Sequence, residues 1–217
     1  MKRRGLFITI EGIDGTGKST QLQLLADWLR SRGYKPRLTR EPGGTRIGEK
    51  IRGILLASQN SELTSLTELL LMYAARQQHL EEVVRPALDR GEIVLSDRFN
   101  DASLAYQGYG RQLGEAPVRL LDRLVCRRIR PDLTLILDVP ARTALARASK
   151  RDGRGSHQRF EGEGIRFQDR VRKGYLKIAE EQPGRVRVIH ASGPAREVHG
   201  QIRNAVSALL DKHRLKI

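Results

Sequence analysis

The sequence has a single cysteine, Cys126, so it can form no disulfide within the chain and no zinc site built on several cysteines. Aromatic side chains make up only 5% of the residues, which leaves few platforms for stacking single-stranded nucleic acid. No apolar run approaches the roughly 18 residues that a membrane-spanning helix needs. The apolar stretch 6–10 is also too short for a secretory signal core of about 7–15 residues. We therefore expect a cytoplasmic protein with no membrane partner.

Acidic residues are scarce relative to basic ones, with 25 Asp and Glu against 40 Lys and Arg, and the formal net charge is +15. This excess indicates an anionic partner, either nucleic acid or small phosphate compounds. One helical basic cluster comprises Arg119, Arg123, Arg127, Arg128 and Arg130. Because few aromatic residues accompany these arginines, we interpret the cluster as a solvated or interface surface and expect no nucleic-acid partner.

Short apolar strands alternate with amphipathic helices along the whole chain. Strands are predicted at residues 5–10, 34–39, 93–97, 133–139 and 186–189. Helices are predicted after residue 20 up to Gly33, and at 47–56, 64–89, 120–126, 141–149, 165–178 and 198–210. Continuous apolar strands flanked by helices are typical of a parallel sheet covered on both faces. We predict one α/β domain, 1–217, with about five strands, in which the polar segment 151–164 is a loop that serves as a mobile LID.

Residues 12–19 match the phosphate-binding pattern G-x-x-x-x-G-K-[ST] at every specified position. The motif follows a predicted strand and opens a predicted helix, where backbone N–H groups and the helix dipole attract phosphate. In a P-loop NTPase fold, Lys18 is expected to contact the β- and γ-phosphates of ATP, and Ser19 to hold Mg²⁺. The expected nucleotide site comprises Gly12, Ile13, Asp14, Gly15, Thr16, Gly17, Lys18, Ser19 and Thr20.

The P-loop alone does not choose among classes of nucleotide enzyme. The sequence lacks the N-K-x-D motif of GTPases, and ATP-driven motors are usually longer. A small kinase remains, and such an enzyme needs a second anion site with arginines that neutralise the developing charge.

Four further segments indicate the acceptor of that kinase. They are Arg40-Glu41-Pro42-Gly43-Gly44-Thr45, Tyr73-Ala74-Ala75-Arg76, Asp97-Arg98-Phe99 and Ala102-Ser103-Leu104-Ala105-Tyr106-Gln107-Gly108. Together with the P-loop, these segments closely resemble the bacterial thymidylate kinases over nearly the whole chain. The resemblance implies a homodimeric enzyme that transfers the γ-phosphoryl group of ATP to dTMP with Mg²⁺, giving dTDP and ADP in dTTP biosynthesis.

The resemblance also implies roles for individual residues. Asp14 would accept a hydrogen bond from the sugar 3′-hydroxyl, and Arg98 would bridge the acceptor phosphate and the transferred group. Asp97 would support the metal through water. Arg76 would donate to a thymine carbonyl, and Tyr106 would lie under the deoxyribose, where a ribose 2′-hydroxyl would clash.

The walls of the base pocket are expected from the same segments. Pro42 would shape the wall beside the base, while Ser103 and Gln107 would face other base edges. Many relatives have Phe four residues before the base-reading arginine. Here that position is Met72, next to Tyr73, and either side chain could pack on thymine.

The relatives differ in where their catalytic arginine lies. One group has it in the P-loop directly after the Asp, where this sequence has Gly15. The catalytic arginine is therefore expected from the LID, and Arg159 is the first candidate, although Gln158 stands where relatives usually have Asp. Arg151 and Arg154 are the alternatives. With Lys18 and Arg98, Arg159 completes the predicted catalytic set.

Two other acceptors stay open. A deoxynucleoside kinase uses a neutral 5′-hydroxyl, which needs a general base, and Glu41 is placed where such enzymes carry theirs. The continuation Gly43-Gly44-Thr45 argues against this alternative and leaves Glu41 as a wall of the acceptor site. A kinase for UMP or AMP is the second alternative. A phosphate monoester such as dTMP is mostly dianionic at pH 7 and needs no base.

Overall fold

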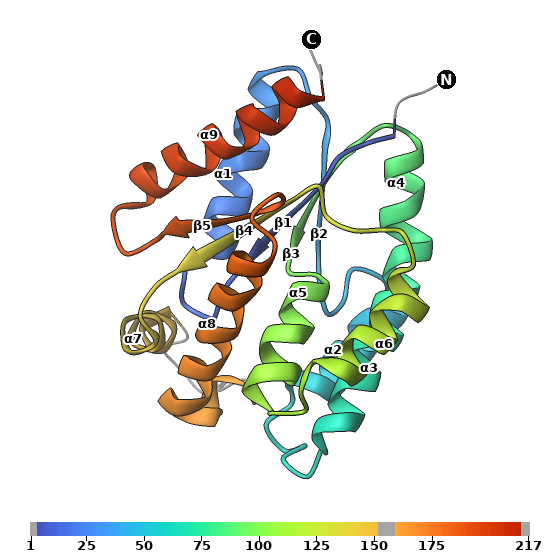
Figure 1. The fold of residues 1–217 in the computed structure, drawn as a ribbon, viewed down its shortest axis with the longest axis vertical. Helices are drawn as coiled ribbons and strands as arrows, with labels where there is room; N and C mark the ends of the chain where they lie inside the picture. The colour runs from blue at the N-terminus through green and yellow to red at the C-terminus, as the bar shows by residue number, and fades with distance from the viewer. Residues whose placement is uncertain (1–3, 152–158, 214–217) are drawn as a thin grey trace.

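The structure, a computed structural model, describes residues 4–151 and 159–213. Its centre is a parallel sheet with the strand order β2-β3-β1-β4-β5 (Figure 1). The strands are β1 (Phe7–Glu11), β2 (Pro36–Arg40), β3 (Ile93–Asp97), β4 (Leu133–Asp138) and β5 (Val186–His190). The three inner strands are apolar and buried along nearly their full length, whereas β2 and β5 at the edges are partly exposed. The predicted α/β fold with a five-stranded parallel sheet is confirmed.

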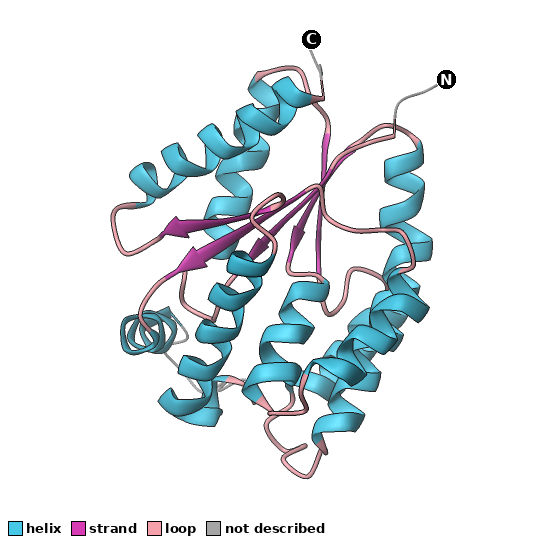
Figure 2. Cartoon of the chain, in the orientation of Figure 1, coloured by secondary structure: helices cyan, strands magenta, loops and turns pink. Residues whose placement is uncertain are grey.

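Helices cover both faces of the sheet, as Figure 2 shows. In chain order they are α1 (Lys18–Ser31), α2 (Arg46–Leu56), α3 (Ser65–His79), η1 (Leu80–Val84), α4 (Arg85–Asp89), α5 (Asn100–Ser103), η2 (Leu104–Gly110), α6 (Glu115–Leu121), η3 (Asp122–Cys126), α7 (Ala141–Arg151), η4 (Glu161–Glu163), α8 (Gly164–Glu181) and α9 (Ala195–Lys212). Helices α1 and α9 pack together on one face, and α5 and α8 lie on the other (Figure 1). Among the described residues, no helix has the length and apolar character to cross a membrane.

Three helical segments differ from the sequence prediction. No helix or strand is predicted for the segment 100–110. The segment is nevertheless helical and ends in the π-helical turns of η2. The helix expected at 120–126 begins earlier, at Glu115, because Pro117 lies in the first turn, where a missing N–H costs nothing. The long helix expected at 64–89 forms, but five residues of π-helix interrupt it at η1.

The register of the inner strands positions the site. Strand β1 pairs with β3 so that Ile10 lies opposite Asp97. The loop after Glu11 and the residue after Asp97 therefore leave the sheet side by side at its carboxyl edge. In an open α/β sheet, ligands bind outside this edge, where the connections of neighbouring strands diverge.

Candidate active site

The loop between β1 and α1 is closely packed against the rest of the protein. Gly15 has φ 83°, and a Cβ atom there would lie 1.9 Å from the carbonyl oxygen of Ala144 in α7. Gly12 has φ 133°, and a Cβ atom there would lie 2.7 Å from the carbonyl oxygen of Leu137. Any larger residue would require the backbone to move, so an arginine has no room at position 15.

The Lys18 ammonium lies inside the P-loop. Its Nζ donates to the carbonyl oxygens of Gly12 at 3.0 Å and Ile13 at 2.9 Å, and it lies 3.5 Å from Asp14 Oδ1. Burial, together with the nearby Arg98 cation, lowers the pKa of Lys18. The ammonium is thus positioned by the loop that it would serve in binding phosphate.

Ser19 and Asp97 lie together at the start of α1 and the end of β3. The Ser19 hydroxyl donates to Asp97 Oδ2 at 3.5 Å. Asp97 Oδ1 is buried and accepts no hydrogen bond from the described residues. Hydroxyl and carboxylate oxygens are ligands that suit Mg²⁺, which usually takes one or two carboxylates and keeps several waters. The residues present therefore fit the expected metal site.

Arg98 connects the end of β3 to the P-loop. Its Nη2 lies 2.5 Å from Asp14 Oδ1 and 3.4 Å from the hydroxyl of Tyr106. Its backbone is left-handed, with φ 71°, and is held by a bond from its N–H to the carbonyl oxygen of Ile10 at 3.0 Å. Burial alone would raise the pKa of Asp14, but Arg98 and Lys18 hold it well below its usual range. Asp14 is consequently a carboxylate at all physiological pH values.

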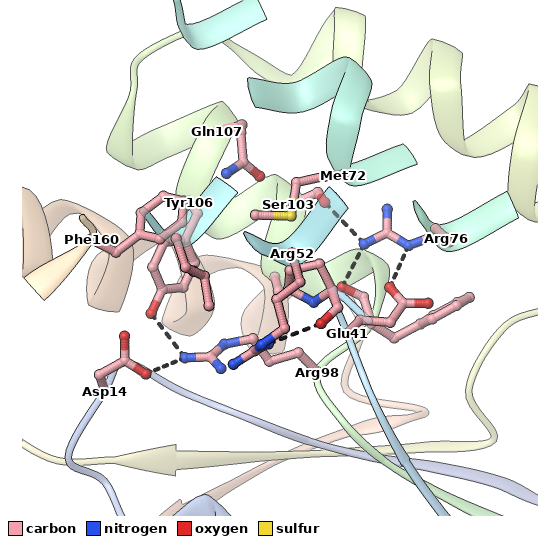
Figure 3. Close-up of a pocket in the computed structure, with 14 residues that line it drawn as sticks. Asp14, Glu41, Arg52, Met72, Arg76, Arg98, Ser103, Tyr106, Gln107 and Phe160 are labelled. Atoms are coloured by element: carbon pink, nitrogen blue, oxygen red, sulfur yellow. Dashed lines mark hydrogen bonds and ion pairs between the residues drawn. The ribbon is translucent and has the colours of Figure 1, made fainter. Parts of the chain in front are cut away.

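A cavity opens beside this ion pair, and its empty space together with the open solvent at its mouth is about 500 Å³ (Figure 3). Nine of the residues predicted for the acceptor site line it: Asp14, Glu41, Pro42, Met72, Arg76, Arg98, Ser103, Tyr106 and Gln107. These come from the P-loop, the loop after β2, α3 and the helical segment after β3. The predicted acceptor residues, apart from Tyr73, thus lie around one cavity.

Arg76 on α3 is buried and held on three sides. Its Nε donates to Glu41 Oε2 at 2.7 Å, and its Nη2 donates to the carbonyl oxygen of Phe99 and to Ser103 Oγ, both at 3.0 Å. Among the described residues its Nη1 has no partner. A buried donor without a partner is costly, which makes Nη1 the nitrogen of Arg76 that is left to bind a ligand.

Glu41 uses both of its oxygens inside the protein. Besides Arg76, it contacts His79 Nδ1 through Oε1 at 2.9 Å, and the other ring nitrogen of His79 lies 2.6 Å from Thr39 Oγ1. Burial would raise the pKa of Glu41, but Arg76 and the hydrogen bond with His79 lower it overall. Glu41 is therefore a partner that orients Arg76, which disfavours its role as a general base.

The structure separates the two candidates for packing on the base. The Tyr73 hydroxyl donates to Asp122 Oδ1 at 2.7 Å, and its ring lies 4.4 Å from the Arg76 guanidinium, outside the lining of the cavity. Met72 lines the cavity instead (Figure 3). Met72 is thus the residue positioned to contact a base, and that contact stays a prediction.

Tyr106 and Gln107 reach the cavity from the π-helical turns of η2, an arrangement frequent at functional sites. The Tyr106 ring packs edge-on against Phe160 at 5.5 Å, and it is almost fully buried. Gln107 Nε2 donates to Glu68 Oε1 at 2.7 Å, while Gln107 Oε1 has no partner among the described residues. Gln107, which lines the cavity, therefore keeps one acceptor oxygen unused among these residues.

Arg159 lies away from the position expected for it. Its Nη2 donates to the buried carboxylate of Glu68 at 2.6 Å, and its Nε donates to the carbonyl oxygen of Leu55 at 3.0 Å. It does not line the cavity. A buried carboxylate attracts a neighbouring guanidinium strongly, which accounts for this placement. Contact between Arg159 and the transferred group stays a prediction.

Parts of the LID prediction lie outside the described residues. Arg154 and Gln158 fall there, and so does the side chain of Arg151. At the other end of the expected loop, residues 161–163 form η4, and α8 begins at Gly164.

Sequence reasoning gave no site role to five residues that line the cavity: Arg52, Leu56, Phe99, Ala102 and Phe160. Arg52 on α2 donates from Nη1 to the carbonyl oxygen of Pro42 at 2.9 Å, and burial with the nearby Arg40 and Arg98 lowers its pKa. Phe160 closes the side next to Tyr106. An arginine on an amphipathic helix is normally interpreted as a solvated residue. The one sequence signal that Arg52 belongs to the site is its short distance from the loop at 40–45.

The chain is similar to known proteins over nearly its whole length. The sequence model of the family described as thymidylate kinase matches residues 10–202. The chain is 46% identical over 209 residues to a thymidylate kinase of Desulfovibrio desulfuricans, covering 94% of this chain and 96% of that protein. It is 48% identical over 210 residues to one of Pseudomonas savastanoi, covering 97% and 99%. The crystal structure of thymidylate kinase from Ehrlichia chaffeensis superposes with a TM-score of 0.75 at 36% identity, covering 94% of this chain and 99% of that one.

Proposed function

The chain belongs to the thymidylate kinase family, and we propose that the cavity beside the Asp14–Arg98 pair is where it holds dTMP. The enzyme transfers the γ-phosphoryl group of ATP to dTMP and forms dTDP and ADP, a step of dTTP biosynthesis. The observation that carries the proposal is the convergence of an anion-binding end and a base-reading end in one cavity. Arg98 and Arg52 line the first end, and Arg76 and Gln107 the second.

At the anion-binding end, cations surround the point where two phosphates must meet. Lys18 binds the donor phosphates, and Arg98 bridges the acceptor phosphate and the transferred group. Arg52 adds a second cation to the acceptor phosphate. Mg²⁺, held by Ser19 and by Asp97 through water, supplies further neutralisation of negative charge when bound. Since the acceptor is already dianionic, positioning and charge neutralisation suffice for the reaction.

At the base-reading end, two buried atoms remain for the ligand. Arg76 Nη1 is a donor, and Gln107 Oε1 is an acceptor. Thymine presents a carbonyl oxygen at C4 and an N–H at N3, which complement this pair. Cytosine presents the opposite pattern, an amino group at C4 and an acceptor at N3. A site built to hydrogen-bond one pattern rejects the other strongly, because its buried groups would stay unpaired.

The sugar lies between the two ends in this proposal. Tyr106 borders the cavity with a ring fixed by Phe160, Phe167 and Tyr175 around it. Such a ring cannot move aside for a ribose 2′-hydroxyl. Asp14, which is ionised, accepts a hydrogen bond from the 3′-hydroxyl.

The test is ADP formation from ATP and Mg²⁺ with dTMP, dUMP, dCMP, UMP and thymidine as parallel acceptors, for wild type and Arg76→Met. We expect strong turnover with dTMP, weaker turnover with dUMP, and almost none with the other three. Arg76→Met should raise KM for dTMP by about tenfold or more, because a donor to the base is lost. Turnover of thymidine above that of dTMP would contradict the assignment of Glu41, and an unchanged KM in Arg76→Met would contradict the location of the base.

We also propose that the enzyme acts in the cytoplasm as a homodimer, without a nucleic-acid partner. Four large apolar side chains stand exposed on α3 and on the α6–η3 segment that it contacts: Leu66 at 51%, Leu70 at 49%, Leu120 at 59% and Leu124 at 67%. Each pair is four residues apart and so shares a helix face. Exposed apolar patches of this kind mark protein interfaces, and a second copy of the chain fits this one.

A further inference from the structure

Glu68 on α3 is a fully buried carboxylate outside the lining of the cavity. It accepts hydrogen bonds from Gln107 Nε2 at 2.7 Å, Arg111 Nε at 3.1 Å and Arg159 Nη2 at 2.6 Å. A carboxylate so far from water is tolerated only when its charge and lone pairs are satisfied. Its three donors come from two parts of the chain, Gln107 and Arg111 at the end of η2 and Arg159 more than 40 residues later.

The charges around Glu68 form a neutral cluster of two acids and two arginines. Arg111 contacts Glu68 and also pairs through Nη1 with Glu163 Oε1 at 2.5 Å. Arg159 and Glu163 both belong to the segment 159–163, which we name the LID root. The LID root is therefore held at two points, by Glu68 at one end and by Arg111 at the other.

Holding the LID root fixes a wall of the cavity. Phe160, directly after Arg159, packs its ring edge-on against Tyr106 at 5.5 Å and lines the cavity. Its carbonyl oxygen accepts from Gln168 Nε2 at 2.8 Å, and the Arg159 guanidinium lies 4.7 Å from its ring. Loss of the Arg159–Glu68 contact would free Phe160, and with it the side of the pocket that faces the sugar.

Glu68 also fixes which end of the Gln107 amide faces the cavity. A carboxylate only accepts hydrogen bonds, so the amide must turn its NH₂ group toward Glu68. The carbonyl oxygen of Gln107 is then left without a partner among the described residues, as the structure shows. A flipped amide would place two oxygens in contact and leave the NH₂ group facing the base.

We propose that Glu68 is a positioning residue for the acceptor site, which holds Arg159 so that Phe160 completes the pocket and holds Gln107 so that its carbonyl reads the base. The proposal rests on the proposed function of the cavity. In it, Arg159 acts through Glu68 rather than on the transferred phosphoryl group. One buried carboxylate thus couples the docking of the LID root to the choice of base.

The test compares Glu68→Gln, Arg159→Met and the double variant in steady-state kinetics with dTMP and dCMP. Each single variant should raise KM for dTMP about tenfold, while kcat at saturation and KM for ATP stay within about threefold. Glu68→Gln should also lower the ratio of kcat/KM for dTMP to that for dCMP at least tenfold, because the Gln107 amide is free to turn. The double variant should resemble the single variants, since contacting residues are not additive.

Asp101→Asn is the matched control, because Asp101 is also a buried carboxylate with a two-point contact to an arginine, Arg185, yet it does not line the cavity. It should leave the dTMP to dCMP ratio unchanged. If Arg159→Met lowered kcat about 100-fold both in the wild-type protein and in Glu68→Gln, the proposal would be overturned. Arg159 would then act on the transferred group. An unchanged base preference in Glu68→Gln would overturn it as well.

A failure of the proposed role of Glu68 can be distinguished from a failure of the proposed dTMP site. Arg76→Met, measured beside these variants, reports whether the base lies in this cavity at all. If Arg76→Met weakens dTMP binding and Glu68→Gln does not, only the role of Glu68 fails. Should Glu68→Gln not fold, Arg159→Met alone decides, because a positioning role raises KM and a catalytic role lowers kcat.

Discussion

Arg98 Nη2 lies 2.5 Å from Asp14 Oδ1, so an ion pair joins the end of β3 to the P-loop. The pair faces the cavity on one side and Lys18 on the other. Arg98 itself has a left-handed backbone, with φ 71°. Strained backbone of this kind persists only when its surroundings hold it, and it concentrates at functional sites.

Replacement of Arg98 by Met should lower kcat at least about 100-fold, because one charge-stabilising donor at the transferred group is lost. The variant keeps only the aliphatic part of the side chain, and the contact of the guanidinium with the Tyr106 ring is lost together with the charge. Steady-state rates with saturating ATP and dTMP provide the measurement. Arg119→Met, which removes a partly exposed arginine paired with Glu115, serves as the control and should behave as wild type. A kcat within tenfold of wild type in Arg98→Met would remove Arg98 from the catalytic set.

Replacement of Glu41 by Gln should raise KM for dTMP about tenfold. Thymidine should not be phosphorylated by the variant, as by the wild type. The neutral amide no longer compensates the buried Arg76 cation, so the donor that faces the base loses its fixed position. Titration calorimetry with dTMP alone separates this binding defect from catalysis. If Glu41 were a general base, kcat would fall by a factor of about 100 or more with little change in dTMP affinity.

The sequence was informative about the sheet because each strand is a short apolar run followed by a helix. Strand β3 matches its predicted range, 93–97, in full. The helical segment 100–110 escaped prediction because polar residues and glycines mask its apolar period. Asp101 in this segment is buried with Arg185, 84 residues away, and Gln107 is buried with Glu68. Pairings between such distant positions leave no local pattern.

Which residues would surround one cavity was predictable from motifs, but what each one contacts was not. Glu41 and Arg76 were both expected in the acceptor site, yet their mutual ion pair was not. Arg159 was expected on the phosphates from its place in the LID, and its contact with Glu68 was not expected, because Glu68 lies 91 residues away and has no motif of its own. Competition among buried charges is settled by three-dimensional proximity, which a single sequence does not report.

Conversion of Leu70 and Leu124 to Glu should produce a monomer. Both side chains are about half or more exposed in the single chain, and acids in their place would be buried unpaired in a dimer interface. Light scattering after size-exclusion chromatography should give twice the chain mass of 24.5 kDa for wild type and the single mass for the variant. Ile165→Glu, at an exposed apolar residue on α8, is the control and should stay dimeric. A wild-type monomer would contradict the proposed homodimer.

Glu11, directly before the P-loop, should make the protein less stable as pH rises through neutrality. Its side chain is fully buried, and it accepts hydrogen bonds from the backbone N–H of Phe99 at 2.7 Å and the hydroxyl of Tyr175 at 2.9 Å. Burial, reinforced by the nearby Asp101, raises the pKa of Glu11 from 4.5 to about 8. Between these two values the folded protein binds a proton that the unfolded chain has released.

The free energy of unfolding must therefore fall with pH in this range, because the folded state holds the extra proton. The contribution of Glu11 is complete below pH 4.5, decreases by at most about 1.4 kcal/mol per pH unit above it, and levels off above about pH 8. This contribution is measured by urea unfolding at pH 5.5, 7 and 8.5, as the difference in the free energy of unfolding between wild type and Glu11→Gln. The glutamine in the variant cannot titrate. Glu115→Gln is the control, since the pKa of Glu115 is lowered and Glu115 stays ionised throughout. If the free energy of unfolding changed with pH in the same way for wild type and Glu11→Gln, Glu11 would already be ionised in the folded protein. The Tyr175 hydroxyl would then donate its hydrogen bond to a carboxylate.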